Sequence, residues 1–119
     1  MSEIKSPRTR DKGRGTRDVA EGASKIVIQR LSSEEKKRLG IPETLRSSGP
    51  WSVWECEPST FDWRYSDQEV AFVYEGQVKV KAGNNEVHIK AGDLVTFPKG
   101  LSCTWQVLKT IRKVYKFER

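Results

Sequence analysis

The chain has 119 residues, of which 35% are hydrophobic, and it carries a formal net charge of +6. This length fits one compact domain and excludes two independent enzyme domains. No apolar run approaches the roughly 18–20 residues of a membrane-spanning helix, and the two cysteines are too few for a disulfide scaffold and lack the spacing of a zinc site.

The N-terminal segment, residues 1–23, is basic and poor in apolar residues. Residues 1–17 hold six basic and two acidic side chains, so 6 − 2 = +4 of the net charge lies here. Because this segment cannot bury enough apolar surface to offset the entropy of ordering, we expect it to be disordered in isolation. It is either a solvated extension or an arm for an acidic protein or nucleic-acid partner. It contains no signal-peptide core, so we expect a cytoplasmic protein, or a stromal one if the source bears plastids.

The next segment predicts one strand and one short helix. Residues 24–30 (SKIVIQR) form a β-rich run that is typical of a strand. Ser32 is followed three residues later by Glu35, which is the pattern of a capping box and predicts a helix start. Gly40 and Pro42 then predict the end of this helix.

From Trp51 onward, short β-rich runs alternate with turn residues such as Glu75-Gly76. Eight strands at regular spacing are typical of an all-β sandwich or barrel. Residues 24–119 are therefore expected to form a single all-β domain with one short N-terminal helix. The expected strands cover residues 51–56, 61–65, 69–74, 78–80, 87–89, 94–98, 103–108 and 111–117.

Two motifs carry a family resemblance. Residues 63–76 read W-x-Y-x3-E-x6-G and residues 92–103 read G-x5-P-x-G-x2-C, which are the spacings of the double motif of the cupin superfamily. The string GDLVTFPKGLSCTW at 92–105, with RKVY at 112–115, is similar to the small cupins that resemble the cupin domain of (S)-ureidoglycine aminohydrolase. The resemblance covers residues 50–117 and implies an RmlC-like jelly-roll barrel.

The resemblance also bears on metal binding. Most metal-dependent cupins hold their ion with three histidines and one glutamate, and the corresponding positions here are Trp63, Tyr65, Glu69 and Cys103. An indole nitrogen has no usable lone pair, and a tyrosine would bind a metal only as the costly phenolate. Two remaining ligands fall short of the three that catalytic zinc usually takes. His88, the only histidine, is expected to face solvent. We therefore expect a metal-free barrel without a cofactor.

A pocket is expected where the inward faces of these strands meet. It is either a small-molecule site with aromatic walls or a barrel interior filled by its own side chains. Lys113 is expected to pair with Glu69 or to lie on the rim. Burial among rings would raise the pKa of Glu69, which would suit a general acid or base. The expected lining residues are Trp63, Tyr65, Glu69, Phe97, Cys103, Trp105, Lys113 and Tyr115.

Three functions remain open. The favoured one is a metal-free cupin that binds a small ligand or acts as an interaction module. The second is an aminohydrolase- or isomerase-type enzyme with Glu69 as the catalytic acid or base; a cysteine nucleophile is not expected, because Cys103 has no histidine partner and lies near an anion. The third is an accessory subunit that docks on an acidic assembly through residues 1–23. The strand at 25–30 is a candidate for exchange across a homodimer, since open sheet edges tend to be covered.

Overall fold

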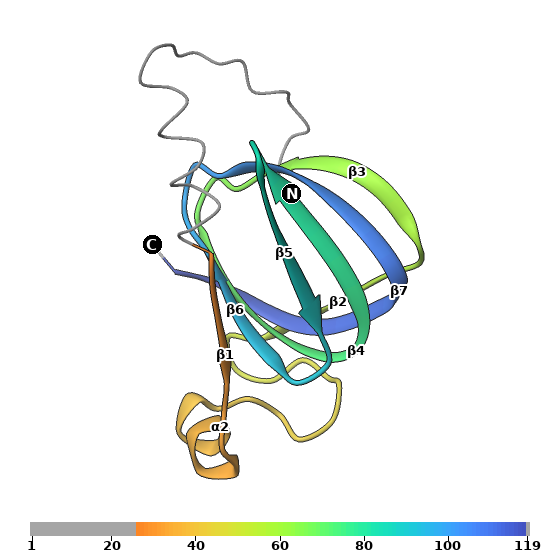
Figure 1. Ribbon diagram of the computed structural model, residues 1–119. Coiled ribbons are helices and arrows are strands. Elements are labelled where there is room, and N and C mark those ends of the chain that lie inside the picture. The colour runs from red at the N-terminus through yellow and green to blue at the C-terminus, as the bar shows by residue number, and fades with distance from the viewer. Residues whose placement is uncertain (1–25, 119) are drawn as a thin grey trace.

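The computed structural model describes residues 26–118, which form a curved antiparallel sheet that closes into a barrel, with one helix beside it (Figure 1). The basic segment expected to be disordered, residues 1–23, lies outside the described residues. No described helix is long and apolar enough to cross a membrane. The elements are β1 (Val27–Arg30), α2 (Ser33–Leu39), β2 (Ser52–Cys56), β3 (Ser59–Arg64), β4 (Gln68–Ala82), β5 (Asn85–Lys90), β6 (Asp93–Phe97) and β7 (Ser102–Glu118).

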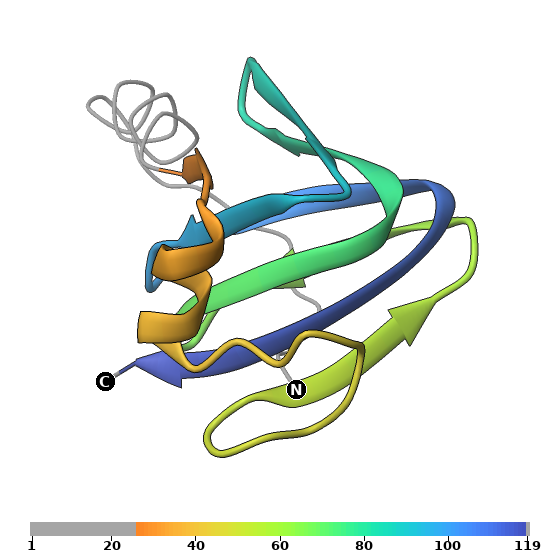
Figure 2. The same ribbon diagram turned by 90° about the horizontal axis from the view of Figure 1, so that it is seen from below.

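The sheet has seven strands, all paired antiparallel. Its main order is β1-β6-β4-β7-β2, with β3 added to β7 and β5 added to β4. The two long strands, β4 and β7, pair with each other and curl around the interior, so that β2 and β3 come to lie across the barrel from β6 (Figure 2). This architecture confirms the expected all-β barrel with one short N-terminal helix.

Two expected strand breaks are wrong. Residues 69–74 and 78–80 belong to one strand, β4, and the two expected C-terminal strands likewise form the single strand β7. Gly76 makes no turn; it has a φ of 107° and lies where the β4–β7 register shifts. A Cβ atom at Gly76 would collide with the Thr110 carbonyl and lie 2.6 Å from the Cα atom of Ile111. The glycine is therefore required by a β-bulge inside a continuous ladder.

The helix α2 begins and ends as predicted. The Ser32 hydroxyl accepts a hydrogen bond from the Glu35 amide at 3.1 Å, and the Glu35 carboxylate accepts one from the Ser32 amide at 2.8 Å. Gly40 ends the helix with a φ of 73°. The segment that follows α2 packs on the outer face of the sheet. We call this contact the outer cluster; its buried members are Ile41, Trp51, Val70, Phe72, Leu94 and Val114.

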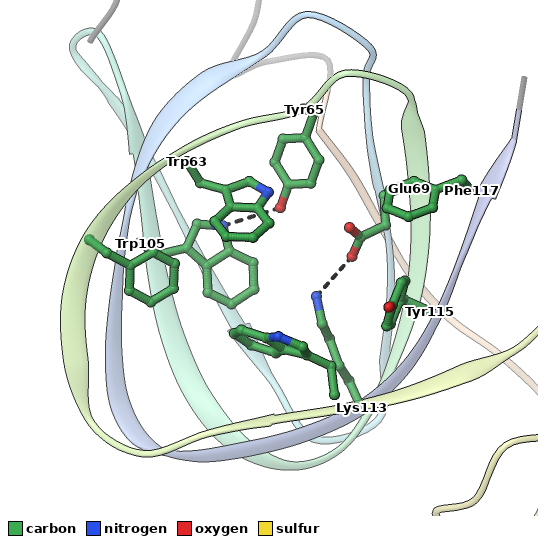
Figure 3. A pocket seen from close by; sticks show the side chains of 9 residues that line it. Trp63, Tyr65, Glu69, Trp105, Lys113, Tyr115 and Phe117 are labelled. Carbon is green, nitrogen blue, oxygen red and sulfur yellow. Dashed lines mark hydrogen bonds and ion pairs between the residues drawn. The ribbon is translucent and has the colours of Figure 1, made fainter. Parts of the chain in front are cut away.

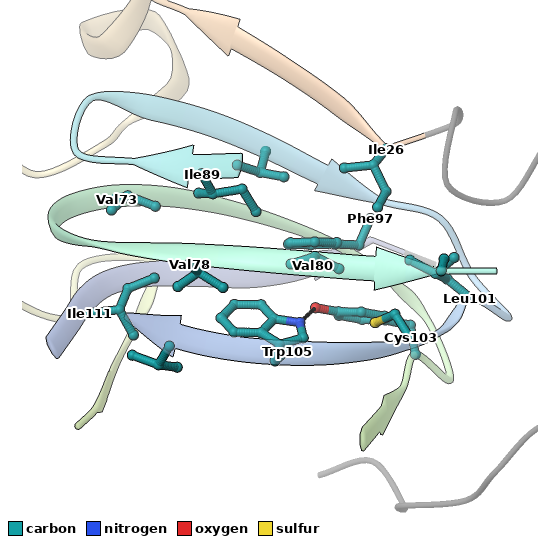
Figure 4. Close-up of a cluster of buried hydrophobic side chains, with 14 residues drawn as sticks. Ile26, Val73, Val78, Val80, Ile89, Phe97, Leu101, Cys103, Trp105 and Ile111 are labelled. Carbon is teal, nitrogen blue, oxygen red and sulfur yellow. Dashed lines mark hydrogen bonds between the residues drawn. The ribbon is translucent and has the colours of Figure 1, made fainter. Parts of the chain in front are cut away.

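The interior of the barrel is filled by a second set of side chains, which we call the inner core (Figure 4). Alternation along β4 sends Val70 and Phe72 to the outer cluster and Val73 to the inner core. The register shifts that follow Val73 change this parity, so that Val78 and Val80 also face the inner core. His88 points away from this core and is exposed, as expected. The buried members of the inner core are Ile26, Tyr65, Val73, Val78, Val80, Ala82, Ile89, Val95, Phe97, Leu101, Cys103, Trp105, Val107 and Ile111.

The strand expected to exchange between two copies, residues 25–30, appears as β1 from Val27 onward. It pairs with β6 of the same chain, and Arg30 forms an ion pair with the buried Asp93 at 3.3 Å. β1 lies at the end of the sheet order, and all four of its residues are exposed. Exchange across a homodimer stays a prediction.

Candidate functional site

A pocket of about 80 Å³ opens at the end of the barrel where β2, β3 and β7 curl over the start of β4 (Figure 3). Aromatic residues dominate the lining, because alternation turns Phe61 and Trp63 of β3 and Trp105, Tyr115 and Phe117 of β7 toward the same space. The nine lining residues are Trp54, Phe61, Trp63, Tyr65, Glu69, Trp105, Lys113, Tyr115 and Phe117.

These nine residues form two levels. We call the buried level the floor; it consists of Tyr65, Glu69, Trp105 and Lys113, each no more than 5% exposed. We call the other level the rim, and it is entirely aromatic. Rim residues are partly or, for one of them, largely exposed, so the pocket opens to solvent through rings. The rim consists of Trp54, Phe61, Trp63, Tyr115 and Phe117.

An ion pair lies at the floor. The Lys113 ammonium donates a hydrogen bond to one carboxylate oxygen of Glu69 at 2.8 Å, and both side chains are almost fully buried. The β4–β7 ladder pairs Glu69 with Phe117 and Lys113 with Val73, so the two long side chains reach toward each other along the strands. Of the two positions expected for Lys113, the structure shows the inward one.

The Lys113 ammonium also lies among ring faces. Its distance to the ring centroid is 4.8 Å for Trp54 and Trp105, 5.7 Å for Tyr115 and 6.0 Å for Phe97. Such distances are those of cation–π contacts, which become stronger when the cation is shielded from water. The rings therefore compensate part of the desolvation cost of a charge that the barrel buries.

Tyr65 contributes a neutral hydroxyl to the floor. Its oxygen accepts a hydrogen bond from the Trp105 indole at 3.2 Å, and its ring stacks on Phe97 with centroids 4.7 Å apart. Burial raises the pKa of Tyr65 well above its usual value, and the nearby Glu69 carboxylate and Cys103 raise it further. Tyr65 therefore keeps its proton and can donate a hydrogen bond into the pocket.

Phe97 and Cys103 were expected in the lining, but both lie in the inner core beside the pocket. The Cys103 thiol donates to the Trp63 carbonyl at 3.7 Å. Burial raises the pKa of Cys103 to about 12, with further contributions from Asp62 and Glu69. A thiol with this pKa is no nucleophile near neutral pH, in agreement with the expectation that Cys103 is not activated.

Three lining residues, Trp54, Phe61 and Phe117, were not among those expected. For two of them a signal existed: Phe61 alternates in phase with Trp63, and Phe117 alternates in phase with Lys113. Trp54 gave no such signal, because its position in the lining depends on β2 pairing with the C-terminal half of β7.

The residues at the metal-ligand positions of related cupins do not fit a metal ion. Trp63 offers only a donor N–H. Tyr65 and Cys103 hold their protons, since the pKa of each is raised, and Glu69 is paired with the Lys113 ammonium. Within residues 26–118, no three His, Cys, Asp or Glu side chains come together in a group that could bind an ion. Glu69 provides the only carboxylate among the nine lining residues, and the Lys113 ammonium therefore lies beside it.

Comparison with known proteins gives a family and several similar structures. The family of EutQ-like cupin domains matches residues 46–115. A DUF861 family protein from Thermotoga maritima is 38% identical, with a TM-score of 0.71 over 79% of this chain and 100% of that chain. No curated protein matches the sequence.

Two more distant structures share the fold. The EutQ protein of Clostridium difficile is 22% identical, with a TM-score of 0.52 over 76% of this chain and 64% of that chain. A cupin-2 domain protein from Shewanella frigidimarina is 16% identical, with a TM-score of 0.50 over 74% of this chain and 94% of that chain. At these identities the likeness concerns the barrel alone.

Proposed function

The chain belongs to the family of EutQ-like cupin domains, and from the pocket described above we propose that it binds a small molecule without the help of a metal ion. The observation that carries this proposal is the Glu69–Lys113 pair at the floor of a cavity that opens through rings. A barrel that served only as a scaffold would be filled by apolar side chains, which are often as stabilising as a buried ion pair or more so.

The narrower resemblance to ureidoglycine aminohydrolase cupins is supported by the string at 92–105 but not by the metal-ligand positions. An enzyme of the aminohydrolase or isomerase type would use Glu69, the only carboxylate among the nine described lining residues. That alternative also requires a ligand in this pocket. Docking on an acidic assembly through residues 1–23, and a cytoplasmic location, remain separate proposals.

Binding can be tested with a library of small fragments and the nitrogen-15 spectrum of the indole N–H groups. Trp54, Trp63 and Trp105 line the pocket, whereas Trp51 lies in the outer cluster and donates to the Leu39 carbonyl at 3.2 Å. We expect fragments to shift the three pocket indoles and to leave the Trp51 indole unmoved, because the pocket is a concave site with oriented polar groups and Trp51 lies outside it.

Two matched variants test whether fragment binding depends on the charged residues of the floor. The double variant Glu69→Gln/Lys113→Met removes both charges at nearly constant volume, and fragment binding should be lost. The control Lys116→Met changes a lysine of the same strand whose ammonium lies over Trp51 in the outer cluster, and it should bind like the wild type. If no fragment shifts the pocket indoles, or if the double variant binds equally well, the proposal is wrong.

A further inference from the structure

We infer that the ligand of this pocket is a small neutral carbonyl compound with a hydroxyl or amide N–H beside its carbonyl group. The inference rests on the proposed function and names the class of ligand. It follows from three properties of the pocket: its size, the charge already present on its floor, and the hydrogen-bonding groups that remain unused there.

Size limits the ligand first. A water-sized probe occupies about 10–15 Å³, so a cavity of about 80 Å³ holds about five to eight non-hydrogen atoms. The exposed ring of Phe117 and the partly exposed ring of Tyr115 border the opening. Nucleotides, cofactors and amino acids with large side chains are too big to enter completely.

The charge of the floor excludes ions of either sign. Glu69 and Lys113 neutralise each other at 2.8 Å, and both are almost fully buried. An added anion or cation would leave a net charge in a poorly solvated site, which is costly. A cation is disfavoured further, because Lys113 already occupies the space between the Trp54 and Trp105 rings, where an ammonium group would bind.

The unused hydrogen-bonding groups define the polar pattern of the ligand. An ammonium has three N–H donors, and the described residues provide one acceptor for that of Lys113, a Glu69 oxygen. The Tyr65 hydroxyl accepts from Trp105, and none of residues 26–118 accepts its proton. The second Glu69 oxygen has no donor within the same range. A carbonyl oxygen can accept from Lys113 or Tyr65 while an adjacent O–H or N–H donates to Glu69.

The direction of these groups supports this placement. In Figure 3 the Tyr65 hydroxyl, the Glu69 carboxylate and the Lys113 ammonium point toward the same central space, between Trp63 on one side and Tyr115 on the other. A flat carbonyl group between these rings would stack on apolar surface while its oxygen meets the floor. Acetamide and hydroxyacetone have this chemistry and are small enough for the cavity.

Two matched pairs of compounds test the inference on the full chain, with the pocket indoles as reporters. Acetamide and acetate have nearly the same shape but differ in charge, and hydroxyacetone differs from acetone by the added donor. We expect acetamide to bind at least about tenfold more tightly than acetate, and hydroxyacetone at least about tenfold more tightly than acetone. Ethylammonium should not shift the indoles of Trp63 and Trp105.

A variant identifies the group that holds the carbonyl. Tyr65→Phe keeps the ring that stacks on Phe97 and removes the hydroxyl, so the affinity for acetamide should fall about tenfold. The inference is overturned if acetate or ethylammonium binds as tightly as acetamide, or if the added donor of hydroxyacetone has no effect. If these compounds all fail while other fragments still shift the pocket indoles, the ligand class is wrong and the proposed function stands. If every fragment fails, both are wrong.

Discussion

At one end of the barrel, β-branched aliphatic side chains fill the interior, whereas at the other end rings enclose a cavity around an ion pair. Val73, Val78 and Ile111 in the filled end are each no more than 1% exposed. Both ends are carried by the same two strands: β4 places Glu69 at the open end and Val73 at the filled end, while β7 places Lys113 beside Ile111.

The difference shows that the two ends of one barrel can have different roles, with the filled end contributing stability and the open end a binding cavity. Branched aliphatic side chains pack without leaving space, so the filled end contributes mainly to the free energy of unfolding. Flat rings such as those of Trp63 and Phe61, which meet edge to face at 5.9 Å, cannot fill a curved wall completely. The open end therefore contributes a shaped cavity, and its effect on stability depends on the Glu69–Lys113 pair.

The largest expected effect comes from breaking that pair on one side. Lys113→Met leaves the buried Glu69 carboxylate uncompensated and should lower the free energy of unfolding by about 3–5 kcal/mol. Adding Glu69→Gln to this variant should restore most of the loss, because no charge is then buried. Urea unfolding of the wild type, the single and the double variants measures both effects; a single variant that costs less than about 1 kcal/mol would show that the pair is not desolvated.

A second prediction compares the two ends directly. Ile111→Ala removes a fully buried side chain from the filled end and should cost about 2–5 kcal/mol. Phe117→Ala truncates a rim residue that is 48% exposed, and it should cost less than about 1 kcal/mol. The same unfolding experiment tests this pair, and equal losses would remove the distinction between the two ends.

The last effect concerns Cys103, and it is absent near neutral pH and appears only in alkaline solution. Burial raises the pKa of Cys103 from 9.0 to about 12. Between these pH values the unfolded chain releases the thiol proton and the folded chain does not, so the free energy of unfolding should fall as the pH rises. The fall should be shallower in Cys103→Ala, and the two proteins should not differ in pH dependence near neutrality. Identical slopes in the alkaline range would contradict the assigned burial.

The sequence predicted the fold where the signals are local. The Ser32–Glu35 capping box and Gly40 identified α2 because each acts within a few residues along the chain. The Glu75-Gly76 pair was wrongly interpreted as a turn. A turn and a bulge can both place a glycine at positive φ, and here the β7 backbone against Gly76 distinguishes them.

The site was predictable in part for a similar reason. Alternation along one strand identified Trp63, Tyr65 and Lys113, because the face of a residue depends on its own strand. It could not show where the pocket ends and the adjoining core begins: Tyr65 and Trp105 belong to both, whereas Phe97 and Cys103 lie in the inner core and do not line the pocket. That boundary depends on how far the sheet curls, which is a property of the complete barrel.

The long ladder between β4 and β7 has a consequence for the order of folding. Glu69 and Lys113 are 44 residues apart in sequence, whereas β5 follows β4 directly and can form a hairpin with it on a microsecond timescale. Closing the β4–β7 ladder is a non-local event of the kind that slows β barrels to milliseconds or longer. The pocket exists only once that closure is complete, so a bound ligand should slow the unfolding of the barrel and leave its folding rate unchanged.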